Sequence, residues 1–307
     1  MSLAHVAALD IGGTHVTAAL VDVRTWTVVD GSTCRRDIDS GGDAGTIAAR
    51  IAEAATCTGA TDGTPWGIAI PGPFDYRRGI GDFRGVGKFD ALRGVDVGQL
   101  LHRFGIQGML HFLNDADAFG IGEWTAGAAR GCARAIVVTL GTGVGSAFLV
   151  DGEAVHAGPG VPPEGRLDLL RIDGRPLEWT ISRSAIRARY VGEASVPTAD
   201  VQQIAELARS GDVQALAAVD PPVRALGRVL GPRAAAFAAN VIVVGGAISA
   251  AWDVIEGPLR GGMEEAAPGW SDGCYLHPAQ RVHDAALLGA AWSAARHYPT
   301  GAGGSPA

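Results

Sequence analysis

Two glycine-rich turns in this chain could bind phosphate. The first, DIGGT at residues 10–14, follows an apolar segment and precedes another. The second, LGTGVG at residues 140–145, has the same surroundings. Glycine leaves backbone N–H groups uncovered, so several of them can approach one phosphate oxygen. Two such turns facing each other would hold a nucleotide polyphosphate from both sides, and we therefore expect a nucleotide-dependent enzyme.

A pair of polar residues, Asn114 and Asp115, follows the apolar segment 111–113. Asp115 would then lie at the end of a strand, facing a cleft. A free aspartate, with a pKa near ~4, is a weak base. In a loose phosphoryl-transfer transition state, however, it has only to orient a hydroxyl and accept its proton late. The alternative is that both residues only form a turn or cap a helix, as their turn preference allows.

The elements that must position these residues alternate between strands and helices. Hairpins are expected at 5–22 and 134–150, and single strands at 66–70, 111–113 and 240–244. Helices are expected at 43–56, 97–104, 116–129, 180–191, 199–209, 212–219, 221–239, 250–265 and 284–296. Segments 75–96 and 156–178 have little periodicity and predict loops. The pattern predicts an α/β protein whose sheets are covered by helices, and the repeated hairpin predicts two related lobes.

Composition limits the possible functions. The chain has 307 residues, a net charge of −7 and a pI near 5.6, which argue against a nucleic-acid-binding face. No stretch of about 18 apolar residues and no signal peptide occurs, so we expect a soluble, cytoplasmic protein. The cysteines Cys34, Cys57, Cys132 and Cys274 form no CxxC pair. We expect four reduced thiols, without a disulfide framework or a cysteine-rich zinc site.

Taken together and in order, the motifs resemble the ROK family of sugar kinases and repressors. They are DIGGT at 10–14, PGP at 71–73, ND at 114–115, GAARG at 127–131, LGTGVG at 140–145, VGG at 244–246 and DAALLGAA at 284–291. The resemblance spans residues 5–292. It implies the two-lobed actin/hexokinase-like (ribonuclease H-like) α/β fold with a cleft between the lobes. We expect a small lobe from residues 1–113 and 284–298, a large lobe from 114–283, and a disordered tail at 299–307.

The resemblance also implies roles for individual residues. Asp115 would be the catalytic base, Asn114 would bind a sugar hydroxyl, and Asp10 would hold Mg²⁺ through water. The expected nucleotide-binding residues are Asp10, Gly12, Gly13, Thr14, Thr142, Gly143, Gly245 and Gly246. The alternatives are a turn-capping role for Asp10 and a simple helix-entry turn at the last two glycines.

One departure from the family lies at residues 163–166. Many members carry a Glu-x-Gly-His segment there, followed by cysteines that bind zinc with the His. This chain has Arg166 in place of the His and Pro163 in place of the Glu, while Glu164 could substitute with a shift of one residue. No cysteine cluster follows, so we expect no zinc site. Arg166 and Glu164 remain candidates for acceptor binding.

Glu178, in the segment LEWTIS at 177–182, matches a family glutamate that binds sugar in related glucokinases. It is therefore a stronger candidate for a sugar ligand than Glu164. The alternative is a carboxylate that only stabilises the N-terminus of a helix.

A second departure is GVGKFD at residues 85–90, where hexose-binding members supply an Asn and a Trp. Lys88 could place a charge at the substrate, or the segment could be a solvated loop. The acceptor is therefore open between a hexose, an amino sugar and a cyclitol. Because of both departures, we expect glucose to be a poor acceptor.

The leading interpretation is a kinase that uses ATP and Mg²⁺, without zinc, to phosphorylate a hydroxyl of a sugar or sugar-like polyol. The resemblance implies a homo-oligomer, a dimer, with neither nucleic acid nor membrane as a partner. One alternative is a sugar-responsive transcriptional regulator, which would carry an N-terminal helix-turn-helix ahead of Asp10. Another is a catalytically silent sugar-binding protein, against which the retained Asp10 and Asp115 argue.

Overall fold

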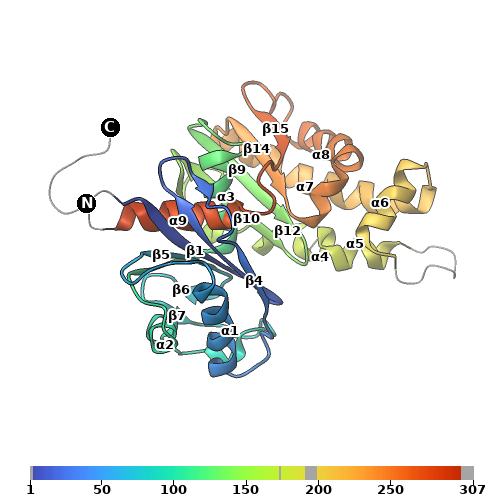
Figure 1. Cartoon of the computed structure of the whole chain (residues 1–307). Coiled ribbons are helices and arrows are strands. Elements are labelled where there is room, and N and C mark those ends of the chain that lie inside the picture. The colour runs from blue at the N-terminus through green and yellow to red at the C-terminus, as the bar shows by residue number, and fades with distance from the viewer. Residues whose placement is uncertain (1–2, 173, 191–198, 299–307) are drawn as a thin grey trace. The chain divides into compact units, whose positions relative to one another are not determined.

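The computed structural model describes residues 3–172, 174–190 and 199–298. These residues form two units (Figure 1). The first contains residues 3–126 and 283–298, and the second contains residues 127–282. The chain thus passes between units after Ala126, rather than after residue 113, because the helix that follows Asp115 packs on the C-terminal helix of the first unit. The expected disordered tail at 299–307 lies outside the described residues.

The first unit is built on one mixed sheet. Its strand order is β3-β2-β1-β5-β8, and β4 pairs with β2. The strands are β1 (His5–Ile11), β2 (His15–Asp22), β3 (Thr27–Val28), β4 (Cys34–Asp37), β5 (Trp66–Ile70) and β8 (Leu110–Asn114). The hairpin β1–β2 is antiparallel, whereas β1, β5 and β8 run parallel. The carboxyl ends of these three strands therefore meet at one edge, which is where α/β sheets usually bind ligands.

Helices α1 (Ala44–Thr56) and α9 (Ala285–His297) pack on this sheet (Figure 1). Ile68 of β5 shares a core with apolar residues of α1. The next residue towards the N-terminus, Gly67, points the other way, and a Cβ there would lie 2.0 Å from the Ala290 carbonyl oxygen of α9. Because neighbouring strand residues point to opposite faces, α1 and α9 cover opposite sides of β5. The third helix, α3 (Asp115–Ala126), packs against α9.

The segment expected to be a loop at 75–96 contains short regular elements. They are β6 (Phe74–Asp75), β7 (Ile80–Gly81) and a 3₁₀ turn (Asp90–Leu92), followed by α2 (Val97–Arg103). Phe74, Phe83 and Phe89 are buried here, with ring centroids 6.1 Å apart for the first two and 5.3 Å apart for the last two. This aromatic cluster anchors the loop to the first unit.

Cys34 and Cys57 form a disulfide, so the expectation of four reduced thiols is wrong for this pair. Cys34 begins β4 and Cys57 is the C-cap of α1. Because α1 packs on β4, the two Cα atoms lie 6.2 Å apart despite a separation of 23 residues in the chain. Cys132 and Cys274 are not joined in a disulfide.

The second unit repeats the same design. Its sheet has the order β11-β10-β9-β14-β15, again with an antiparallel hairpin and parallel strands beside it. The strands are β9 (Arg134–Leu140), β10 (Val144–Val150), β11 (Glu153–Ala154), β14 (Val241–Gly245) and β15 (Tyr275–Pro278), with a separate hairpin of β12 (Arg171–Ile172) and β13 (Arg175–Pro176). The repeated hairpin predicted from the sequence is confirmed.

Long helices α7 (Val213–Phe237) and α8 (Trp252–Ala266) share a core with β9 and β14. The expected break near residue 220 is absent, and α7 continues through Pro221 and Pro222. Close packing against α8 supports this continuous helix. The two backbones approach so closely at Gly227 that a Cβ there would lie 2.3 Å from the Leu259 carbonyl oxygen of α8. The shorter helices are α4 (Glu178–Ile181), α5 (Arg183–Arg189) and α6 (Val201–Arg209). Within the described residues, no helix is long and apolar enough to cross a membrane.

Candidate active site

The first glycine turn joins β1 to β2. The Gly12 N–H donates to the His15 carbonyl oxygen at 2.8 Å, which closes the turn. A Cβ on Gly12 would lie 3.3 Å from that same oxygen, so the turn has little room for a larger residue. Gly13 follows, and a Cβ there would lie 3.5 Å from Cδ of Lys88. Thr14 is exposed at the tip. The turn thus brings small, partly exposed residues to the carboxyl end of β1.

Asp10, the penultimate residue of β1, has a strongly perturbed carboxyl group. Burial and the nearby carboxylate of Asp115 raise its pKa to about 6, against a smaller opposing effect of Arg35. Arg35 belongs to the same row of the sheet, because Asp10 pairs with Thr17 and Thr17 pairs with Arg35. Asp10 and Asp115 belong to the same edge of the sheet, because Asp10 pairs with Ala69 and Ala69 pairs with Leu113, two residues before Asp115.

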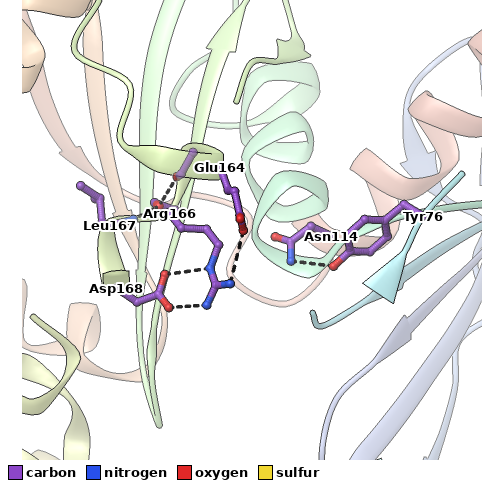
Figure 2. Close-up of polar contacts among 8 residues, drawn as sticks. Tyr76, Asn114, Glu164, Arg166, Leu167 and Asp168 are labelled. Atoms are coloured by element: carbon purple, nitrogen blue, oxygen red, sulfur yellow. Dashed lines mark hydrogen bonds and ion pairs between the residues drawn. The ribbon is translucent and has the colours of Figure 1, made fainter. Parts of the chain in front are cut away.

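Asn114 ends β8, and its side chain has structural partners (Figure 2). Its amide Nδ2 donates to the Tyr76 hydroxyl at 3.0 Å. Its Oδ1 accepts the N–H groups of Ala116 at 3.0 Å and Asp117 at 3.3 Å, which caps α3. The helix-capping alternative therefore describes what Asn114 does in this structure, and its role toward a sugar stays a prediction.

Asp115 is the first residue of α3 and is half-buried. Its Oδ1 accepts the Ala116 N–H at 3.0 Å. Burial raises the pKa of Asp115, while that N–H and the positive charge of Lys88 oppose the rise. A carboxylate with a raised pKa is a better proton acceptor near neutral pH than an ordinary aspartate.

The second glycine turn joins β9 to β10 and has a different neighbour. The Gly141 N–H donates to the Gly143 carbonyl oxygen at 3.0 Å. A Cβ on Gly143 would lie only 2.8 Å from Oε1 of Glu178, the first residue of α4. The carboxylate of Glu178 therefore lies against this turn, and Thr142 is exposed beside it. Glu178 lies at the N-terminus of a helix, as expected for a carboxylate that only stabilises a helix. It also neighbours the predicted nucleotide-binding residues Thr142 and Gly143.

Arg166 and Glu164 lie on the loop that follows β11, and both are exposed. The Arg166 guanidinium donates from Nε and Nη2 to Asp168, at 3.2 and 2.6 Å, and its Nη1 lies 3.7 Å from the Glu164 carboxylate (Figure 2). Ser146 of β10 ties this loop to the sheet, because its hydroxyl donates to the Gly165 carbonyl oxygen at 2.7 Å. The positive charge of Arg166 is thus held between two acidic side chains.

The glycine pair after β14 has a clear structural reason. Gly246 has φ of 84°, and a Cβ there would lie 2.4 Å from the Leu140 carbonyl oxygen. Only glycine fits such a position without displacing the backbone of β9. Gly245 is the buried last residue of β14, and a 3₁₀ helix (Ala247–Ala251) follows.

Residues 6–297 match the ROK family. The chain belongs to the ROK family. Its α/β architecture is that of the actin/hexokinase-like fold, as the motifs predicted.

Several relatives of this ROK protein are named as sugar kinases. A glucokinase of Thermotoga maritima is 30% identical over 310 residues, which cover 92% of this chain and 95% of the relative. The structure of a ROK hexokinase from Thermus thermophilus matches with a TM-score of 0.72 and 25% identity, covering 95% of this chain and 98% of that one. A ROK glucokinase from Streptomyces griseus, in complex with glucose and AMPPNP, shares the fold with a TM-score of 0.76 at 23% identity, covering 95% and 99%.

Sequence reasoning missed a cavity of about 210 Å³ in the second unit of this ROK protein. Helix α6 and the 3₁₀ helix after Gly246 form its walls, which are lined by Val201, Gln202, Ala205, Glu206, Arg209, Ala247, Ile248, Ala250 and Ala251. The motif VGG at 244–246 lies directly before the 3₁₀ helix in the chain, whereas α6 reaches the cavity through tertiary packing. The cavity therefore adds apolar and polar walls next to the glycine pair that was predicted to bind a nucleotide.

Asp10 is the metal-binding candidate that the resemblance implied. Among the described residues, no three or more His, Cys, Asp or Glu side chains are placed to hold a metal ion. A single half-buried carboxylate suits Mg²⁺ that keeps most of its waters and is held mainly by phosphates. Burial and Asp115 raise the pKa of the Asp10 carboxyl group. A nearby hydrated cation would favour its ionised form.

Proposed function

We propose that this ROK-family sugar kinase transfers the γ-phosphoryl group of ATP to a hydroxyl of a sugar or sugar-like polyol, with Asp115 as the general base. The observation that carries the proposal is the register of the first sheet, which brings Asp10, the first glycine turn and the end of β8 before Asp115 to the same edge. A proton acceptor, a candidate metal-binding carboxylate and a candidate phosphate-binding backbone thus meet within one unit.

In the proposed reaction, Asp115 accepts a hydrogen bond from the acceptor hydroxyl and orients its oxygen toward the γ-phosphorus. As the new O–P bond forms, the bond from phosphorus to the β–γ bridging oxygen breaks and ADP leaves. The proton of the hydroxyl passes to the Asp115 carboxylate. Because phosphoryl transfer has a loose transition state, the proton moves late and a carboxylate is sufficient as the base.

ATP would be bound by backbone groups and small residues from both glycine turns. The proposed set is Gly12, Gly13, Thr14, Thr142 and Gly143 for the phosphates, with Gly245 and Gly246 next to the nucleoside. Asp10 would hold Mg²⁺ through water, and the bound ion neutralises charge on the phosphates. The cavity between α6 and the 3₁₀ helix at Ala247–Ala251 offers a place for the base of the nucleotide.

Acceptor binding is assigned to Asn114, Glu178, Glu164 and Arg166. Glu178 is the strongest of them, because a carboxylate accepts hydrogen bonds from sugar hydroxyls and its position against Gly143 holds it at a predicted phosphate site. Arg166 is held by Glu164 and Asp168, so it would act together with them rather than alone.

A coupled assay of ADP release over hexoses, N-acetyl sugars and cyclitols tests the function. We expect sugar-dependent release that requires Mg²⁺. The glucokinase relative makes glucose the first acceptor to try, whereas the departure at residues 85–90 leads us to expect that another acceptor is better. Absence of acceptor-dependent release across the whole panel would overturn the kinase proposal and favour a silent or regulatory sugar-binding protein.

The regulator alternative has less support, because the curated relative that matches over nearly all of its length is named as a kinase.

We also propose that the protein is a homodimer and that it is located in the cytoplasm. Light scattering on the purified protein checks the dimer, and fractionation of cells checks the location.

A further inference from the structure

The loop that carries Lys88 is held in one conformation by its neighbour Phe89. The Phe89 side chain is fully buried, and its ring centroid lies 5.3 Å from that of Phe83. Its backbone N–H donates to the Ser40 carbonyl oxygen at 2.7 Å. The residue that follows Lys88 is therefore fixed from both its side chain and its backbone.

Phe89 also has φ of 60°, in the left-handed region. A bulky residue in this region costs free energy, on the order of 1 kcal/mol or more, and persists only where the surrounding structure enforces it. Gly85 and Gly87 just before it have φ of 68° each, which glycine adopts without strain. Left-handed backbone conformations thus stand on both sides of Lys88 in the chain.

Lys88 differs from the rest of its loop in its surroundings. Residues 84–87 are exposed, whereas Lys88 is half-buried. Its Cδ lies 3.5 Å from where a Cβ of Gly13 would be, so its aliphatic stem runs over the turn. Its positive charge acts on Asp115. The stem of Lys88 thus packs on the predicted phosphate turn, and its positive charge opposes the rise in the pKa of Asp115.

We propose that Lys88 is a further catalytic residue, whose ammonium group contacts the phosphoryl group during transfer and neutralises the charge on its oxygens. This rests on the proposed function. In the reaction, the O–P bond to the acceptor forms, the bond to the ADP oxygen breaks, and the acceptor proton goes to Asp115. Lys88 keeps its proton throughout, and its contribution is electrostatic.

A cation at this place stabilises the transition state more than the ground state. In the transition state the transferred phosphoryl group lies between two oxygens and is shielded from water. Removal of one such donor lowers kcat by about 10²- to 10³-fold in other enzymes. A residue that only bound the acceptor would instead raise KM for the acceptor with kcat nearly unchanged. A solvated loop lysine would change neither constant.

The test compares Lys88→Ala and Lys88→Arg with Arg93→Ala, which removes an exposed cation from the same segment. We expect Lys88→Ala to lower kcat by about 10²- to 10³-fold with little change in acceptor KM. Lys88→Arg, which keeps the charge, should retain more kcat than Lys88→Ala. Ethylamine added to Lys88→Ala should restore part of kcat in a saturable way, and should leave Arg93→Ala unaffected.

Several results would overturn the proposal. They are a kcat near that of the wild type in Lys88→Ala, a change confined to acceptor KM, or a loss of kcat that neither ethylamine nor the arginine side chain restores. A wild-type protein that phosphorylates no acceptor would overturn the proposed function as well, whereas an active wild type with an unaffected Lys88→Ala overturns the role of Lys88 alone. Circular dichroism of each variant checks that its fold is kept.

Discussion

The two glycine hairpins have the same backbone design but carry different side chains around it. In the first, Asp10 stands two residues before the first glycine and the stem of Lys88 packs on Gly13. In the second, Thr139 occupies the place of Asp10, and a carboxylate, that of Glu178, lies against the glycine turn. The cation thus belongs to one turn and the contacting carboxylate to the other.

The difference shows how a repeated element acquires two roles. Neither Lys88 nor Glu178 belongs to a hairpin: the first lies on the loop after β7 and the second begins α4. A glycine turn can donate its backbone N–H groups to any phosphate. Segments from other parts of the chain then place a positive charge (Lys88) beside one turn and a negative charge (Glu178) beside the other. A carboxylate repels phosphate but accepts hydrogen bonds from hydroxyls. On the proposed function, the first turn is therefore suited to the transferred group, and the second has the proposed acceptor ligand Glu178 beside it.

The largest expected effect comes from the proposed base, Asp115, which lies in the same unit as the first turn. Asp115→Asn keeps the size of the side chain but removes its ability to accept a proton. We expect kcat to fall by about 10²- to 10⁴-fold, the usual scale for loss of a general base. Steady-state kinetics with the best acceptor measures this. The exposed Asp62→Asn serves as the matched control, and an Asp115→Asn enzyme as fast as that control would remove Asp115 from the mechanism.

A smaller effect is expected at the second turn. Glu178→Gln should raise the acceptor KM by about 10- to 100-fold, the scale of a hydrogen bond to a charged group, and should change the KM for ATP much less. Initial rates with each substrate varied in turn give both constants. Equal increases in the two constants would place Glu178 at the nucleotide instead of the acceptor.

The carboxyl group of Asp10 predicts a dependence of stability on pH that Thr139 in the second hairpin cannot show. In the folded protein its pKa is raised from 3.8 to about 6. The fold therefore disfavours the ionised form, so this residue destabilises the fold above pH 6, and the cost disappears as the pH falls below about 4. Asp10→Asn should thus be more stable than the wild type at pH 7.5, by on the order of 1–2 kcal/mol.

Urea unfolding in EDTA at pH 7.5 and pH 4 measures that difference without bound Mg²⁺. The stabilisation should be present at the higher pH and absent at the lower one. Asp62→Asn, at an exposed carboxylate, provides the control. A wild type that is the more stable protein at pH 7.5 would contradict the raised pKa of Asp10.

Local patterns in the sequence predicted the parts of the fold that depend on local interactions. The two hairpins follow from apolar segments around glycine turns, and the start of α1 follows from Asp43, whose side chain accepts the Thr46 N–H. Three features depend on contacts between distant segments and were not predictable. They are the continuation of α7 through Pro221 and Pro222, the edge strand β15, and the disulfide between Cys34 and Cys57.

The candidate site also contains residues that local sequence predicts and residues whose position depends on distant contacts. Motifs in the sequence located Asp10, Asn114, Asp115 and the glycines, because each of these residues lies at or near the end of a strand. The sequence left two alternatives for Lys88, since its position depends on the left-handed Phe89 and on burial of that ring among other aromatic residues. The cavity beside Gly246 also depends on packing of α6, which lies far from that turn in the chain.

The most direct test of the comparison is one methyl group added to each turn. In Gly13→Ala the new Cβ would meet Lys88 Cδ at 3.5 Å, an ordinary contact with a flexible side chain. In Gly143→Ala it would meet Glu178 Oε1 at 2.8 Å, which is too close, so the carboxylate must move.

We expect Gly143→Ala to raise the acceptor KM several-fold. Its melting temperature should stay normal, because the atom that the new methyl group meets is the end of the flexible Glu178 side chain. Gly13→Ala should leave the acceptor KM unchanged and act, if at all, on kcat through Lys88. Both variants are measured with the same acceptor and at saturating ATP. If Gly13→Ala raises the acceptor KM and Gly143→Ala does not, the acceptor ligand lies with the first turn and the division of roles between the turns is reversed.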